Sequence, residues 1–176
     1  MGIIKVDELT GITGDGGPSS PITFSGDTIS KFNAPAGMII GVENTTTTTI
    51  VAKSDTTFTT VISQSITVKA GSKVLINVSC PISAGGDSDP AGGQIIQTGT
   101  ASATIMPSTE VMDEHHASSG GYFGITIMSG VLSAGTYTFS FQGNRRSGNA
   151  AVYFVSANPG SGSPSIASMT LYEIAG

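Results

Sequence analysis

The sequence predicts an all-β protein built as an antiparallel β-sandwich or barrel. Apolar residues recur at every second position through most of the chain, and no segment places them with helical spacing over three turns behind a capping residue. Turn-forming clusters such as SAGG, GNRRSGN and NPGSGSP separate the alternating runs. Because each run has one apolar and one polar face, we expect antiparallel sheets with one buried and one solvated side.

The first 35 residues differ from the rest of the chain. They are rich in Gly, Pro, Ser and Asp and carry too little apolar material for a core of their own. We therefore expect an extended N-terminal arm over 1–35 and a sandwich domain over 36–176. The alternating GIIKVDEL could add one strand to the edge of a neighbour's sheet, which predicts an attachment role for the arm. Its expected anchoring residues are Ile3, Ile4, Val6, Leu9, Ile22 and Phe24.

The segment 65–80, SITVKAGSKVLINVSC, predicts a strand, a tight turn at Gly71-Ser72 and a second strand. One face of this hairpin should be buried, and its members are Ile66, Val68, Ala70, Val74, Ile76, Val78 and Cys80. Cys80 is the single cysteine of the chain, so no intrachain disulfide can form. We expect it to be a buried, inert thiol.

Four later runs complete the expected set of strands. They are GYFGITIM (121–128), GTYTFSFQG (135–143), AAVYFVSA (150–157) and SIASMTLYEIA (165–175). In the second of them Tyr137, Phe139 and Phe141 should face the core. Two of the runs carry large side chains on both faces, for example Tyr122 with Phe123 and Tyr153 with Phe154. Because large exposed apolar patches are rare on monomers, this predicts a neighbouring subunit and a homotrimer.

The charge balance excludes several classes of protein. Charged residues make up 11% of the chain, against about 25% in a typical globular protein. The net charge is −5 and Arg145-Arg146 is the only adjacent basic pair, so nucleic acid is not an expected partner. No run of about 18 apolar residues predicts a membrane span. The N-terminus carries no apolar stretch typical of a signal peptide.

The main candidate for a metal site or an acid–base site is the segment 110–127, EVMDEHHASSGGYFGITI, which holds both histidines. Adjacent His115 and His116 would point to opposite faces of a strand, and neither a cysteine nor a third histidine supports them as metal ligands. A polar loop between strands is the favoured interpretation, and we expect no metal, no cofactor and no enzymatic activity. Two alternatives remain. Calcium could bind through Asp87 and Asp89, and glycoside cleavage could use a pair of carboxylates among Asp87, Asp89, Glu110, Asp113 and Glu114.

Several stretches resemble fibre and appendage proteins of tailed phages, in particular marine and cyanobacterial phages. The start MGIIKVDELTGITGDGG is similar to their IKVDEI or IKVDNI opening with its Gly/Ser-rich tract. The stretches SITVKAGSKVLINVS, LSAGTYTFSFQG and ASMTLYEIAG are similar to strands of their distal domain, in the same order. The resemblance implies an eight- or ten-stranded jelly roll akin to tumour-necrosis-factor and complement-head folds, which usually trimerise about a three-fold axis.

The resemblance implies a structural virion protein, made in the host cytoplasm and bound to capsid or tail proteins. The chain lacks the heptads, β-helical repeats and collagen-like triplets of a fibre shaft. This favours a trimeric capsid decoration, a head fibre or a short tail appendage, anchored by its arm. The alternative is a lectin-like receptor-binding module of a tail fibre that binds a host surface glycan. Its candidate contact residues are His115, His116, Tyr122, Asn144, Arg145 and Arg146.

Overall fold

The structure is a computed structural model, and the residues described belong to the compact unit Ala34–Gly176. They are residues 34–84, 90–99, 104–106, 111–113, 121–148, 150–156 and 164–176. The expected arm over 1–35 lies outside these ranges except for its last two residues, and so do all six of its expected anchoring residues.

Every regular element in the described ranges is a β-strand, and every pairing between strands is antiparallel. The strands are β1 (Ile39–Thr47), β2 (Val51–Lys53), β3 (Thr59–Val68), β4 (Lys73–Ala84), β5 (Ala91–Thr98), β6 (Thr104–Ile105), β7 (Val111–Asp113), β8 (Gly121–Met128), β9 (Gly135–Arg145), β10 (Val152–Phe154) and β11 (Ala167–Ile174).

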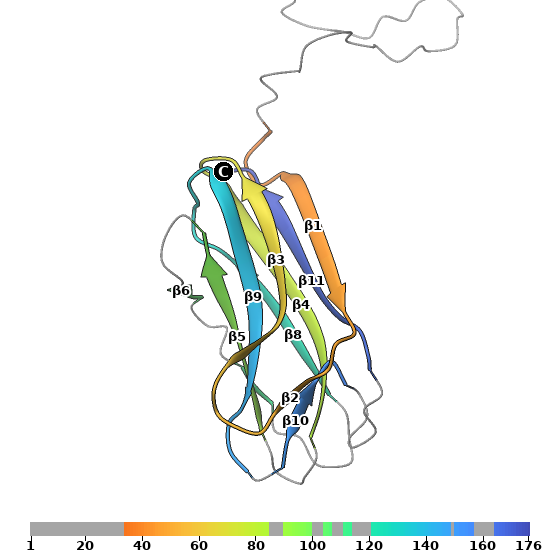
Figure 1. The fold of residues 1–176 in the computed structure, drawn as a ribbon. Helices are drawn as coiled ribbons and strands as arrows, with labels where there is room; N and C mark the ends of the chain where they lie inside the picture. Colours follow the sequence, from red (N-terminus) through yellow and green to blue (C-terminus); the bar gives the residue numbers. More distant parts are fainter. Residues whose placement is uncertain are drawn as a thin grey trace, which may run out of the picture. The chain divides into compact units, whose positions relative to one another are not determined.

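The strands form two sheets that pack face to face (Figure 1). The larger sheet has the order β1–β11–β4–β10–β2, and β8 pairs with β4 on the side opposite β11 and β10. The smaller sheet has the order β3–β9–β5–β6, and β7 also pairs with β5. Six of the ten connections between the described strands pass from one sheet to the other, and the two strand orders are those of a jelly roll. The predicted antiparallel β-sandwich is therefore confirmed.

The turn between β3 and β4 forms at the predicted place, but the two strands enter different sheets and do not pair with each other as the strands of a hairpin would. Gly71 has a φ of +88°, a left-handed conformation that a residue with a Cβ adopts only with strain. On either side of this turn the alternating apolar residues are buried, from Ile66 to Cys80. Ala70 is the exception to the expected inward face, because it lies within the turn itself and is exposed.

The core is centred on three phenylalanine rings. Phe123 of β8 and Phe154 of β10 come from the larger sheet, and Phe141 of β9 comes from the smaller one. The centroid of the Phe123 ring lies 5.6 Å from that of Phe141 and 6.1 Å from that of Phe154. Two glycines of the smaller sheet make room for these rings. A Cβ at Gly93 would lie 2.7 Å from the Phe141 ring, and a Cβ at Gly143 would collide with the Phe154 ring. These contacts lock the two sheets together.

Cys80 lies on the inward face of β4 and is fully buried, as predicted. Burial disfavours the thiolate and raises the pKa of the Cys80 thiol to about 12, although a backbone hydrogen bond from Val155 acts in the opposite direction. Because the thiolate is the reactive form, this side chain behaves as a small apolar residue of the core.

The end of the sandwich that holds the β3–β4 turn is closed by a buried carboxylate. Glu173 of β11 is 5% exposed, and its Oε1 accepts hydrogen bonds from the Lys69 N–H at 2.7 Å and from the Ser72 hydroxyl at 2.7 Å. The C-terminal residues continue this closure, since the Ala175 N–H donates to the Met38 carbonyl at 2.8 Å. The residue that follows β11 is thereby hydrogen-bonded to Gly37 and Met38, at the start of the domain.

Candidate functional site

Most of the residues expected to do chemistry lie outside the described ranges. These residues are Asp87, Asp89, Glu110, Glu114, His115 and His116. Asp113 ends β7, where it is paired with Ala91 of β5, and Arg145 of β9 is paired with Ala91 from the other side. The backbone of the smaller sheet thus places Asp113 and Arg145 on either side of one residue, at the end of the sandwich opposite the β3–β4 turn.

The described residues of the expected glycan contact set do not share one face. Tyr122 is 64% exposed and projects from the outer face of the larger sheet, on edge strand β8. Asn144 belongs to the smaller sheet and is only 2% exposed, because the loop between β2 and β3 covers it. Arg145 and Arg146 are half-buried at the end of β9. Asn144 accordingly has a structural role, in which its amide holds the loop.

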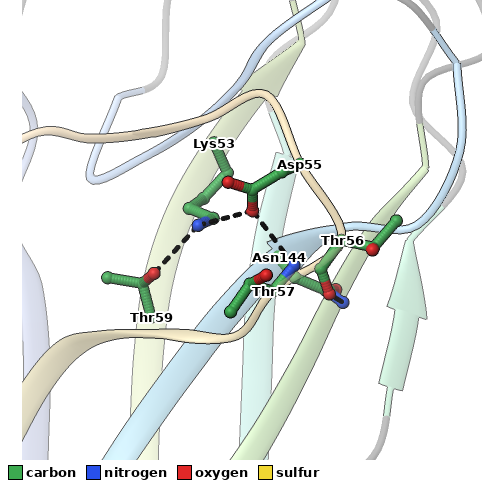
Figure 2. A network of polar contacts seen from close by, with 6 residues as sticks. All are labelled: Lys53, Asp55, Thr56, Thr57, Thr59 and Asn144. Atoms are coloured by element: carbon green, nitrogen blue, oxygen red, sulfur yellow. Dashed lines mark hydrogen bonds and ion pairs between the residues drawn. The ribbon is translucent and has the colours of Figure 1, made fainter.

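The main polar network in the described part of the chain lies in this loop (Figure 2). Lys53 of β2 is buried, and its Nζ lies 2.8 Å from Asp55 Oδ1 and donates to the Thr59 hydroxyl at 2.9 Å. The Thr57 N–H donates to the same Asp55 oxygen at 3.0 Å, which closes an Asx turn. Asp55 therefore orders the loop and neutralises a lysine at the rim of the core.

The end of β9 is fastened to the same loop. Asn144 Nδ2 donates to the Thr56 carbonyl at 2.8 Å, and the Arg145 N–H donates to the Asp55 carbonyl at 3.1 Å. Arg145 Nη1 also donates to the Ala150 carbonyl at 3.2 Å. Asn144 Oδ1 and Arg145 Nε are buried without a hydrogen-bond partner. These contacts fix the positions of the loop residues.

The environment of Asp55 favours its charged form. The hydrogen bond from Lys53, followed by that from the Thr57 N–H, holds the pKa of the Asp55 carboxyl below its ordinary value of 3.8. A folded-state pKa that is lower than the unfolded one stabilises the fold above pH 3.8, and this contribution is lost as the pH falls through the folded-state value.

We expect Asp55→Asn to flatten the acid side of the pH–stability curve. The wild type should lose stability between about pH 4 and pH 2 partly through Asp55, and the asparagine variant should lack that part. Urea midpoints measured across this range test the prediction. Glu43→Gln removes one negative charge elsewhere on the domain and is the control for net charge. Equal acid slopes in the wild type and Asp55→Asn would contradict the role given to this carboxylate.

The loop network was missed by sequence reasoning. The local sequence KSDTT could have indicated the turn, because an aspartate two positions before a residue with a free N–H favours an Asx turn. The tie between this turn and Asn144 could not be found in the sequence, because 88 positions separate Asn144 from Thr56.

No group of three or more potential metal ligands lies close together among the residues that the structure describes. Within the same residues, no helix has the length and apolar character to cross a membrane.

No protein-family model matches the chain, and no curated protein sequence matches it. Among solved structures it is similar to one described as "Structure of infectious bursal disease virus Gx strain", with a TM-score of 0.43 and 10% sequence identity. The alignment covers 78% of this chain and 39% of that one, so this chain spans well under half of the length of the protein that it matches.

Proposed function

We propose that this protein is a structural component of a tailed-phage particle. In this proposal it is a trimeric capsid decoration, head fibre or short tail appendage, anchored by residues 1–35 and exposing the jelly roll that follows. The observation that carries the proposal is the jelly-roll path of the chain, an architecture found in viral capsid proteins and lectins. A fold alone does not specify a function, so the segments that resemble phage proteins supply the second support.

Those segments coincide with adjoining strands of the sandwich. SITVKAGSKVLINVS covers the last four residues of β3 and the first seven of β4, LSAGTYTFSFQG covers most of β9, and ASMTLYEIAG covers β11. In the sheets β3 pairs with β9, and β4 pairs with β11. The similar stretches thus occupy neighbouring positions in each sheet, as expected if the resemblance reflects a common domain.

The surface of the described domain suits a particle component that works through shape and contact. Hydroxyl and amide side chains replace charges over much of it, and only 11% of the chain is charged. The polar groups that are buried at the loop end hold loops in place, as described above for Lys53 and Asn144. This supports a structural role over a catalytic one.

Deletion of residues 2–30 tests the anchoring part of the proposal. We expect the truncated chain to keep the jelly roll, because the described hydrogen bonds of the domain begin at Pro35. We also expect it to stay trimeric but to be lost from particles. The measurements are circular dichroism and light scattering of the pure protein, and mass spectrometry of purified particles made with the deletion.

A pair of point variants refines this test within the full-length chain. Replacing Ile3, Ile4 and Val6 by serine should lower incorporation, whereas replacing Ser19 and Ser20 by alanine should not. Normal incorporation of the deleted chain would place the anchor in the jelly roll and refute an anchoring arm. Absence of the full-length protein from particles would refute the virion role itself. The copy number per particle distinguishes a capsid location, with many copies, from a tail location, with few.

A further inference from the structure

Four side chains form a continuous row across the outer face of the larger sheet. Val42 of β1 lies opposite Tyr172 of β11, Tyr172 lies opposite Leu75 of β4, and Leu75 lies opposite Met128 of β8. Directly opposite residues of antiparallel strands project from the same face. Val42 is 55% exposed and Met128 is 45% exposed, while the two central side chains are half-buried. We call this set the apolar row.

The apolar row continues toward the end of the sheet where the domain begins. In the next paired row Ile39 lies opposite Ile174, and Ile39 is 51% exposed. Met38, immediately before it, is 45% exposed. Lys73 is the only charged residue that projects from the outer face of β1, β11, β4 and β8. The chain carries a net charge of −5, yet this face presents no carboxylate.

The outer face of the smaller sheet has a different character. Its side chains bond to one another, with Ser65 to Thr138 at 2.7 Å and Thr67 to Thr136 at 2.8 Å between their hydroxyl oxygens. Such a face is well suited to contact with water. Beyond the apolar row the larger sheet is polar as well, and Asn44 Nδ2 donates to the Thr170 hydroxyl there at 2.8 Å. The end of the larger sheet near the β3–β4 turn is the apolar part of this face, and a contiguous apolar patch on one face of a domain marks a contact surface.

We propose that the outer face of the larger sheet, centred on the apolar row, is where copies of this chain bind one another. A second copy is the fitting partner because a surface without carboxylates lets an acidic chain associate with itself without repulsion between carboxylates at the contact. The size also fits. Four strands about 4.8 Å apart, over the eight residues of β8 and β11, cover roughly 500 Å², a large part of the ~800 Å² per partner in a stable interface.

The position of the first residues of the domain supports a second copy of the chain as the partner. The Gly37 N–H donates to the Ala175 carbonyl at 2.8 Å, which places the start of the domain beside the Ile39–Ile174 end of the face. In a cyclic assembly through this face whose axis runs along the strands, the first residues of all the domains lie at the same end. The inference rests on the self-association in the proposed function and is independent of any attachment to a particle.

The experiment compares two charge-matched double variants of the full-length chain. Val42→Lys with Met128→Lys places two charges on the apolar row, at its two exposed ends. Ser63→Lys with Ile105→Lys places the same two charges on the outer face of the smaller sheet, where Ile105 is 57% exposed. Light scattering at micromolar concentration should show an oligomer for the wild type and the control variant. The apolar-row variant should have the monomer mass of 17.7 kDa.

Circular dichroism and thermal unfolding establish that both variants are folded. If the lysine pair on the apolar row does not fold, Val42→Ala with Met128→Ala is used, and a dissociation constant at least tenfold weaker than that of the wild type is expected. An apolar-row variant that is folded and keeps the mass of the wild type overturns the inference. A wild-type protein that is monomeric also overturns the inference, and it refutes the predicted trimer as well. Absence of the protein from phage particles would instead refute the virion role and would leave the inference about self-association through this face unaffected.

Discussion

Replacing Phe141 by alanine is expected to lower the free energy of unfolding by about 3–5 kcal/mol, the usual loss for a buried phenylalanine. The ring is fully buried and joins the two sheets through Phe123, 5.6 Å away between centroids, and Phe154, 6.2 Å away. The surrounding rings belong to paired strands and can fill the space only in part, so a cavity adds to the lost burial. Urea denaturation with linear extrapolation measures the change.

Two further variants make this result specific to the core. Phe141→Leu keeps most of the apolar volume and should cost clearly less than the alanine variant. Tyr122→Ala removes an aromatic ring that is 64% exposed, and we expect a change within about 0.5 kcal/mol. A loss at Phe141 no larger than the loss at Tyr122 would mean that the three-ring cluster does not hold the sheets together.

The second large effect is expected at Glu173. Glu173→Ala should lower the free energy of unfolding by about 2–4 kcal/mol, because it leaves the Lys69 N–H and the Ser72 hydroxyl without their acceptor in a buried place. A hydrogen bond to a charged group is worth more than one between neutral groups. Glu173→Gln keeps an amide oxygen that can accept both bonds, so we expect it to lose less than half as much.

Chemical denaturation of the two Glu173 variants beside the wild type decides between a structural carboxylate and an incidental one. Hydrogen exchange at the Lys69 amide supplies a local readout, and it should become faster in Glu173→Ala than in Glu173→Gln. An alanine variant as stable as the wild type, with unchanged protection of this amide, would show that the β3–β4 turn closes without Glu173.

The sequence by itself indicated six of the eleven described strands and the faces that these six bury, and it missed β1, β2, β5, β6 and β7. Alternation with period two marks the apolar face of a strand wherever the strand lies, so the inward positions of Phe139, Phe141 and Cys80 follow from local pattern alone. The turn at Gly71 follows in the same way, because a residue with positive φ in a tight turn between two strands is most readily a glycine. Both properties depend on neighbours along the chain, which a single sequence displays.

Only the tertiary structure decided which strands are neighbours and which polar groups meet. Val42 and Tyr172 stand in one row, and Glu173 reaches an amide 104 positions earlier, through pairings that alternation does not specify. Asn144 looked like a loop residue open to a ligand, and the β2–β3 loop covers it. The physical reason is that alternation assigns a side chain to a face, whereas sheet order and register arise from the packing of the whole core.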